Sequence, residues 1–513
     1  MQRPTYPLAL AALFALLLTP CLTAAPVTVQ GRVLDFADRS LAGALVRSSA
    51  PAGEAAAAKT DDAGLFQLSA APDGPFQVRI EAPGFVTVER TLPPVPAAAG
   101  LPPARLVPGR RLGVEVLDPD GVPVDGALVV VSPLVEQLGP GWRAAPVRVE
   151  TGPQGRVELA TVSNSTLRLE VRATGHPPLL RSVDPEHRSL VLRLQAGRPA
   201  RFEVTADGDA AAGVKIRLTG GATLGESGRD GSLEAVLPAT EVTVQAVAAD
   251  GSWAEARAPV GRTNVSLRLA PADLVAGQVV DRDDGAPLAG AWVWHPPAPA
   301  QAVRSDAAGR FVLPVDPFAD IPLRLTATAV GHRGTSADTG NGEARLALPP
   351  AVTLGGRLLD PAGQPVAGAA VRVAAADRTE PEEERATWGW SGEDGRFQLA
   401  GLPPGEEVWL RARRAGYAPL LQPLTLPAAG EPTTLRLRLQ PAHPAFGQVV
   451  DGAGEGVRGA TVELLPTSAR DSAAGLLTAG EHRISATTDA AGRFIVEGLA
   501  VGTVEAEIGA PGL

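Results

Sequence analysis

The sequence predicts an all-β protein, a tandem array of six small antiparallel β-sandwich modules of which the last is incomplete. Three observations lead to it: turn motifs that recur six times, 57 Gly and 49 Pro spread along the chain, and alternating apolar and polar residues between the turns. A Gly costs roughly 1 kcal/mol and a Pro about 3 kcal/mol inside a helix, so this density excludes long helices. Short strands between frequent turns remain.

The composition is that of a folded chain that does not bind nucleic acid. Hydrophobic residues make up 45% and charged residues 20% of the 513 positions, which is typical of globular proteins and not of disorder. The formal net charge is -10, Lys59 and Lys215 are the only lysines, and no stretch gathers basic residues as phosphate binding requires. We therefore expect no nucleic-acid partner.

Residues 1–25 predict a secretory signal peptide, with Arg3 followed by an apolar run and then small residues. The run is too short to cross a bilayer, so no membrane span is expected after signal removal. Cys21 is the only cysteine, and Pro20 stands where a lipidation motif has Gly or Ala, which argues against a lipoprotein. We expect a secreted, periplasmic or cell-surface protein without disulfides.

The first recurring motif is a strand that ends near Asp, followed by a turn and Gly-Ala-x-Val. In the first copy it is Gly31-Arg-Val-Leu-Asp35 with Gly43-Ala-Leu-Val46. Further copies begin at Gly277, Gly356 and Gly447, and weaker ones at Glu115 and Phe202. Strand side chains alternate, so we expect Val46 and its counterparts Val129, Val293, Val371 and Val462 to face the core.

The second motif is a turn that leads into an alternating strand, as in Thr60-Asp-Asp-Ala-Gly-Leu-Phe66. Glycine adopts the positive φ of a tight turn, and the Asp or Ser before it can bond the turn backbone. We therefore expect a hairpin at each copy. The turn glycines are Gly64, Gly155, Gly231, Gly309, Gly395 and Gly492.

The third motif closes a later strand, as in Ala82-Pro-Gly-Phe85. The turn glycine and the closing glycine are 20 to 22 residues apart in all six copies, which predicts a pair of strands locked in register. The interval from the Gly-Ala motif to the turn glycine instead varies from 18 to 33 residues. Insertions therefore collect in one loop, where binding specificity usually lies.

These motifs divide the chain after the signal peptide into modules 1 to 6. The sixth ends directly after its closing Gly512, so we expect it to lack its last strand and the chain to be part of a longer protein. Pro-rich junctions such as Leu92 to Pro108 and Pro349-Pro350 predict semi-stiff spacers in a rod or loosely articulated array. The module ranges are 27–107, 108–197, 198–271, 272–350, 351–441 and 442–513.

Together these motifs, with Pro287 to Val293 and Pro365 to Val371 as Pro-x-x-Gly-Ala-x-Val, resemble the carboxypeptidase regulatory-like domain. That family is a transthyretin-like β-sandwich of Ig-like architecture, classed among carbohydrate-binding-like folds. The resemblance covers residues 27–513 and is weakest in module 3. It implies accessory modules, placed beside a catalytic domain or in bacterial surface arrays, without catalytic residues of their own.

The residues that carry enzyme chemistry show no catalytic pattern. None of the six histidines lies in H-E-x-x-H, and no nucleophile elbow or nucleotide-binding loop is present. His176 and His332 occupy the aromatic position of the closing turn, which favours packing roles. The repeats use the pattern Asp-x-x-Gly in their hairpin turns. For the acidic segments at Asp61-Asp62 and Asp281 to Gly285, this use favours a turn over a Ca²⁺ site. We expect no enzyme activity, metal or cofactor within this chain.

Tryptophan is the most informative residue type for binding. If Val293 faces the core, Trp292 and Trp294 point away from it, and three more tryptophans lie in the long variable loops of modules 2 and 5. Exposed aromatics mark contact surfaces for a sugar or a partner protein. The alternative is that these rings cover a neighbouring module or their own loop. The candidate ligand contacts are Trp142, Trp292, Trp294, Trp388 and Trp390.

From the sequence we expect a secreted or cell-envelope binding and spacer protein that contacts a polysaccharide or a surface protein. The alternative is the non-catalytic N-terminal stalk of a longer secreted enzyme, a peptidase or a glycan-degrading enzyme. In that case the catalytic domain lies beyond residue 513.

Overall fold

The computed structural model contains β-strands and turns and no α-helix in the part of the chain that it describes, which confirms the all-β prediction. No helix within that part is long and apolar enough to cross a membrane. The predicted signal peptide and the closing turn of module 6 lie outside the described residues. The described residues are 27–49, 56–70, 75–92, 99–134, 141–295, 301–316, 318, 323–338, 344–375, 387–428, 433–466, 484–499 and 502–509.

Modules 1 and 2 each contain two sheets that face each other. In module 1 the first sheet has β1 (Val27–Asp35), β4 (Leu65–Ala70), β7 (Ala99–Gly100) and β8 (Ala104–Leu106), and the second has β2 (Leu45–Ser49), β3 (Ala57–Lys59), β5 (Phe76–Glu81) and β6 (Val88–Leu92). In module 2 the first has β9 (Arg110–Leu117), β13 (Arg156–Val162) and β16 (Ser189–Arg193), and the second has β10 (Leu128–Pro133), β12 (Val147–Glu150), β14 (Leu167–Arg172) and β15 (Leu179–Val183). The short β11 (Arg143–Ala144) of module 2 pairs with β6 of module 1.

Modules 3 and 4 repeat this plan. In module 3 the first sheet has β17 (Gly197–Ala206), β18 (Asp209–Ala210), β21 (Ser232–Pro238) and β24 (Asn264–Leu269), and the second has β19 (Lys215–Leu218), β20 (Thr223–Glu226), β22 (Val242–Val247) and β23 (Trp253–Ala258). In module 4 the first has β25 (Asp273–Asp281), β28 (Arg310–Val315) and β31 (Ala344–Leu348), and the second has β26 (Trp292–Trp294), β27 (Val303–Arg304), β29 (Arg324–Thr328) and β30 (Thr335–Asp338).

Module 5 is complete and module 6 is smaller within the described residues. In module 5 the first sheet has β32 (Val352–Leu359), β35 (Arg396–Leu402) and β38 (Thr433–Arg438), and the second has β33 (Ala370–Ala375), β34 (Thr387–Trp390), β36 (Glu407–Arg413) and β37 (Leu420–Thr425). In module 6 the sheets are β39 (His443–Gln448) with β42 (Arg493–Leu499), and β40 (Thr461–Pro466) with β41 (Ile484–Thr487) and β43 (Val504–Gly509). In modules 1 to 5 the first strand pairs in parallel with the last strand, as β32 does with β38.

Six clusters of buried apolar residues form the interior of the described part of the chain. Each cluster is centred in one of the six expected modules. The motif valines Val46, Val129, Val293, Val371 and Val462 are all fully buried, which confirms that they face the core. Because the clusters are separate, each module has its own hydrophobic interior.

The turn glycine has the predicted backbone conformation but does not form the predicted hairpin. Gly64 has a φ of 72°, and a Cβ there would collide with the Val33 carbonyl. The turn joins β3 in one sheet to β4 in the other, and β4 pairs with β1. The two strands between the turn glycine and the closing glycine are therefore not partners. Their near-constant spacing reflects a crossing from one sheet to the other.

The glycine of the first motif faces the phenylalanine of the second motif across the first sheet. Gly31 is the register partner of Phe66, and a Cβ on Gly31 would lie 2.6 Å from the Phe66 ring. The same pairing joins Gly277 to Phe311, Gly356 to Phe397 and Gly447 to Phe494. In the two weaker copies both members differ, as Val114 with Val157 and Phe202 with Leu233. The ring therefore occupies the space that the missing side chain leaves.

A buried hydroxyl group in every module joins two loops that cross between the sheets. In module 5, Ser391 Oγ donates to the Val366 carbonyl at 2.7 Å and accepts from the Ala369 amide at 2.8 Å. Ser391 lies before the second-motif turn, whereas Ala369 belongs to Gly-Ala-x-Val. The equivalent residues are Thr60, Thr151, Ser227, Ser305 and Thr488, all buried.

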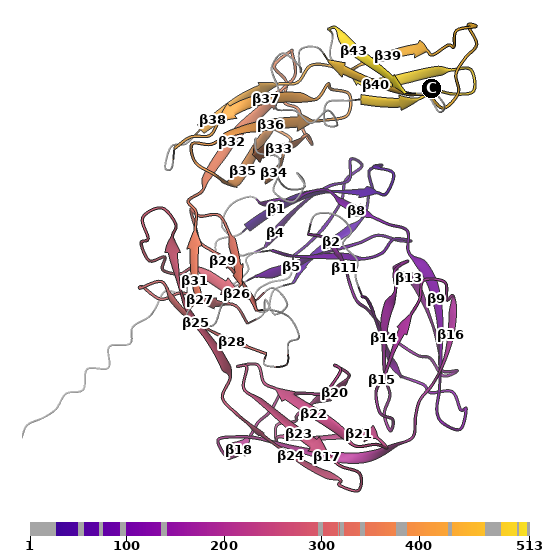
Figure 1. The fold of residues 1–513 in the computed structure, drawn as a ribbon, viewed down its shortest axis with the longest axis vertical. Helices are drawn as coiled ribbons and strands as arrows, with labels where there is room; N and C mark the ends of the chain where they lie inside the picture. The colour runs from indigo at the N-terminus through magenta and orange to yellow at the C-terminus, as the bar shows by residue number, and fades with distance from the viewer. Residues whose placement is uncertain are drawn as a thin grey trace, which may run out of the picture.

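The linkers between modules are bonded to the closing turns. Phe85 forms a bridge with Pro108, His332 with Pro350 and Tyr417 with Pro441. The Gly109 amide also donates to the Gly84 carbonyl at 3.0 Å. Each closing turn therefore fixes the direction in which the next module begins. Figure 1 shows the modules following one another along a curved path that brings module 5 beside module 1.

We expect Ser391→Ala to destabilise module 5 by about 1–3 kcal/mol, because it leaves the buried Ala369 amide without its side-chain acceptor. Hydrogen exchange of module 5 amides in the full-length chain measures this, since one unfolding midpoint is not defined for six modules. The exposed Ser189→Ala in module 2 is the control, for which we expect less than about 0.5 kcal/mol. Equal protection of module 5 in Ser391→Ala and in the unsubstituted chain would contradict the expectation.

Candidate functional site

The structure buries three of the five candidate tryptophans. The exposed fraction is 1% for Trp142, 3% for Trp390 and 6% for Trp294. Trp292 and Trp388 are half-buried. The expectation of exposed rings is therefore wrong for Trp142, Trp294 and Trp390, because protein atoms and not solvent surround them.

Trp142 belongs to module 2 in sequence and to the core of module 1 in space. Its ring is part of the buried cluster that contains Val29 and Phe76, and its Nε1 donates to the Pro102 carbonyl at 3.3 Å. The following strand, β11, continues the second sheet of module 1 by pairing with β6. The long variable loop of module 2 thus holds modules 1 and 2 together.

Trp390 holds module 5 against the same part of module 1. Its Nε1 donates to the Leu101 carbonyl at 3.1 Å, although the two residues are 289 positions apart. Trp388 pairs in register with Gly100, which leaves β34 beside β7. A side chain on Gly100 would collide with the Trp388 backbone, so the close approach requires glycine. As a result, a single sheet runs from β37 of module 5 to β4 of module 1 (Figure 1).

These contacts differ from the expected rod or loosely articulated array. Segment 99–102 of module 1 accepts hydrogen bonds from a tryptophan of module 2 and from another of module 5. Large aromatic rings contribute most of the burial at such contacts, and their N–H groups need a partner once buried. Modules 1 to 5 therefore form a closed arrangement, in which module 5 returns to module 1.

The tryptophans of module 4 lie on the outer face of its second sheet. Trp292 is opposite Arg304, whose guanidinium carbon is 4.5 Å from the ring centroid. Trp388 and Arg372 form a similar opposed pair in module 5, at 5.7 Å. Cation–π contacts of this kind cover one face of each ring. Trp292 and Trp388 therefore stay candidates for ligand contact, and Trp388 in addition stacks against Trp390 with the ring centroids 6.4 Å apart.

Sequence reasoning missed the aromatic contact between modules 3 and 4. Trp253 meets Phe318 edge to face, with the ring centroids 5.3 Å apart. Arg217 of module 3 pairs with Asp316 at 3.0 Å and lies over the same Phe318 ring at 5.6 Å. The only sequence signal was a tryptophan at the closing turn of the weakest repeat, where modules 1, 2, 4 and 5 have Phe, Tyr or His.

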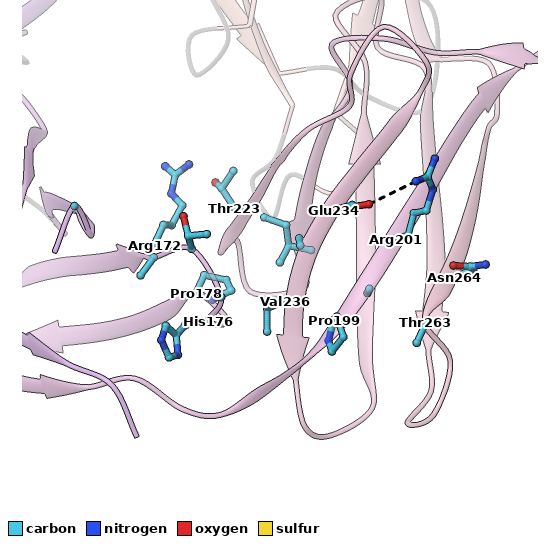
Figure 2. Close-up of a pocket in the computed structure, with 17 residues that line it drawn as sticks. Arg172, His176, Pro178, Pro199, Arg201, Thr223, Glu234, Val236, Thr263 and Asn264 are labelled. Atoms are coloured by element: carbon cyan, nitrogen blue, oxygen red, sulfur yellow. Dashed lines mark ion pairs between the residues drawn. The ribbon is translucent and has the colours of Figure 1, made fainter. Parts of the chain in front are cut away.

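Modules 2 and 3 border a cleft of about 770 Å³, shown in Figure 2. Figure 2 places Arg172 and His176 on one side, and Arg201, Glu234 and Asn264 on the other. Arg201 and Glu234 form an ion pair at 3.5 Å, which leaves the cleft without a strong net charge there. Its apolar walls include Pro178, Pro199 and Val236.

The histidines and carboxylates singled out from the sequence take part in backbone and turn contacts. His332 Nε2 is 2.8 Å from Asp281 Oδ2, and its Nδ1 is 3.0 Å from the Val330 carbonyl. His295 Nδ1 is 2.9 Å from the Arg324 carbonyl. Both contacts orient rings near strand ends. The hydrogen bond from His332 is the main reason that the pKa of Asp281 is lowered.

The acidic turns bind their own backbone. Asp306 Oδ1 accepts from the amides of Ala308 and Arg310, at 2.9 and 2.8 Å, and these bonds lower the pKa of Asp306. Asp61 Oδ1 accepts in the same way from the Ala63 and Leu65 amides. Among the described residues, no group of three or more His, Cys, Asp or Glu is placed to hold a metal ion.

We expect the stability of module 4 to fall with acidification through the Asp281 carboxylate. Because the folded pKa is lowered, this stabilisation is complete above the unfolded value of about 3.9 and is lost as pH falls through the folded pKa. Asp281→Asn should weaken hydrogen-exchange protection of module 4 at about pH 6 and reduce its further loss toward about pH 3. Asp338→Asn, at an exposed carboxylate of the same module, is the control and should retain the pH dependence of the unsubstituted chain.

We expect Trp390→Ala to release module 5 from module 1. The ring lies outside the core cluster of module 5, so the lost packing and the lost Leu101 bond, together about 3–5 kcal/mol, fall on the contact. Small-angle X-ray scattering should then show a larger radius of gyration with all modules folded. Trp292→Ala, in module 4 and away from this contact, should leave the profile unchanged. An unchanged radius of gyration for Trp390→Ala would exclude this role.

Two segments of the chain match the family model of the carboxypeptidase regulatory-like domain, residues 28–102 and 353–440. These are the bodies of modules 1 and 5. A search of curated protein sequences finds no significant match.

Three solved structures illustrate the structural likenesses. The Bacillus anthracis TIE protein is 12% identical, with 72% of each chain covered and a TM-score of 0.16. Shaft pilin SpaA from Lactobacillus rhamnosus GG is 12% identical, with 34% of this chain and 98% of the pilin covered and a TM-score of 0.17. Hydroxyquinol 1,2-dioxygenase from Pseudomonas putida is 13% identical, with a TM-score of 0.15, and the match spans 18% of this chain and 56% of the dioxygenase. These TM-scores are too low to support any conclusion about function.

The repeated motifs, the paired sheets of each module and the two family matches agree with one another. The protein is a multidomain all-β chain that carries carboxypeptidase regulatory-like domains in tandem.

Proposed function

We propose that this chain is a non-catalytic binding and spacer protein of the cell surface or the extracellular space. The observation that carries the proposal is the use of Trp142 and Trp390 as anchors between modules. A spacer that only separates two ends has no need of such contacts. A binding protein gains from them, because fixed modules hold the clefts between them in one shape before a ligand arrives.

The absence of catalysis is part of this proposal and is supported by how reactive side chains are used. The buried hydroxyls of residues such as Ser305 and Ser391 are occupied in loop contacts within each module. His332 has both ring nitrogens within 3.0 Å of an acceptor oxygen, one of Asp281 and one of the Val330 backbone. The carboxylates of Asp61 and Asp306 accept hydrogen bonds from backbone amides. Such groups serve folding and are not free to act as nucleophile or base.

The outer face of the second sheet of module 4 is the proposed contact surface. Trp292 is half-buried there, and the hydroxyls of Thr326 and Ser336 bond each other at 2.8 Å on the neighbouring strands. A half-exposed ring on the same sheet face as hydroxyl groups, which here lie opposite Trp294, suits a sugar or a polar protein surface, since one part packs while another hydrogen-bonds. Secretion, which the N-terminal residues predict, would place this face outside the cell.

Binding of the full-length chain to a glycan array tests the proposal. Trp292→Ala should reduce binding to the recognised glycans about tenfold, which is the loss of one aromatic contact. Val330→Ala, at a 73% exposed side chain of the same module, is the matched control and should bind normally. Identical profiles for Trp292→Ala and the unsubstituted chain would remove this surface from the proposal.

A further inference from the structure

Module 5 carries three arginines side by side on the outer face of its first sheet. Arg357 in β32 is the register partner of Arg396 in β35 on one side and of Arg436 in β38 on the other. Neighbouring strands are about 4.8 Å apart, so the three side chains form one row across the sheet. Like charges directly opposite each other destabilise a sheet, and folding alone does not account for this row.

The equivalent positions in the other modules do not repeat it. The central residue of the row is the one in the first strand, which is Arg357 in module 5. In module 2 it is Glu115, which forms an ion pair with Arg156 at 3.1 Å and lies beside Val191. In module 4 the central residue is the neutral Gln278, between Arg310 and Arg345. The remaining central residues are Arg32 beside Leu65, Glu203 beside Ser232 and Ser266, and Gln448 beside Arg493.

Nearby carboxylates leave most of this positive charge uncompensated. Arg357 Nε donates to the Asp394 carbonyl at 2.8 Å, which is a neutral acceptor. Arg396 is 3.5 Å from the Asp394 carboxylate, and both side chains are largely exposed, so the pair is weak. Among the described residues, a single carboxylate therefore pairs with the three guanidinium groups, in a chain whose net charge is -10.

The row lines a groove of about 560 Å³ at the contact between modules 5 and 1. Gln30 of module 1 and Gln398 and Thr434 of module 5 also line it, and Trp390 forms part of its wall. The two side-chain amides and the Thr434 hydroxyl can donate hydrogen bonds to neutral hydroxyl groups and accept hydrogen bonds from them. The groove thus combines three cations with neutral hydrogen-bonding groups.

We propose that this groove binds an acidic polysaccharide, with sugar carboxylates on the arginine row and sugar hydroxyls on Gln30, Gln398 and Thr434. Guanidinium groups pair with carboxylates through two parallel hydrogen bonds, which suits a row of arginines better than lysines. A nucleic acid is disfavoured, because three cations neutralise few phosphates. The groove is separate from the Trp292 face, so either site can fail without the other.

Binding of the full-length chain to polygalacturonate at low ionic strength tests this inference. The unsubstituted chain should bind polygalacturonate and not its fully methyl-esterified form, which has no charge. Arg357→Gln with Arg436→Gln should lower the affinity about tenfold or more, because two charge-assisted contacts are lost. Hydrogen exchange of module 5 confirms that the double variant is folded.

Arg310→Gln with Arg345→Gln is the control, since it also removes two arginines from the outer face of a first sheet, in module 4, where they flank the neutral Gln278. It should retain full binding. Equal loss in both double variants, equal binding of the methyl ester, or tighter binding of a short single-stranded DNA would each overturn the inference. Retained binding by a folded Arg357→Gln/Arg436→Gln variant would do so as well.

Discussion

A buried hydroxyl in the arch between the two sheets is the contact on which each module depends. The first strand and the Gly-Ala-x-Val strand lie in different sheets, so the chain crosses twice at the same end of the sandwich. Ser391 and its counterparts bond one crossing to the other from inside the module. Without that bond, two backbone groups in each arch lose a partner in a place that water does not reach. This bond therefore fixes how the two crossings, and with them the two sheets, lie relative to each other.

Modules that are complete in themselves still share residues at their borders. Trp142 is the clearest example, because it fills the core of the module before its own. Arg217 with Asp316 and Trp253 with Phe318 join modules 3 and 4 in a more polar way. These contacts join a loop of one module to the core or the strand residues of its neighbour, so the sandwich can stay constant while the joints differ. These loops thus set the path of the array.

The fold was largely predictable from the sequence because its signals are local. The motif valines, the positive φ of Gly64 and the backbone-bonded Asp306 each depend on a few neighbouring residues. Signals that span the molecule were not predictable in the same way. Nothing near Trp390 indicates that its partner is Leu101, and alternation alone cannot tell a ring that faces solvent from one that faces another module. The hairpin prediction failed for a related reason, since a turn motif does not specify which sheet the next strand joins.

The parallel pairing of first and last strands has a mechanical consequence. The chain enters each of modules 1 to 5 at one end of this pair and leaves it at the other end. Tension along the chain therefore loads all hydrogen bonds of the ladder together in shear and does not open them one by one. The ladder has six register pairs in modules 3 and 5 and five in modules 2 and 4, and in module 1 its five pairs are divided between β7 and β8. The Trp390 joint between modules 5 and 1 would give way before any ladder and release slack while every sandwich stays folded.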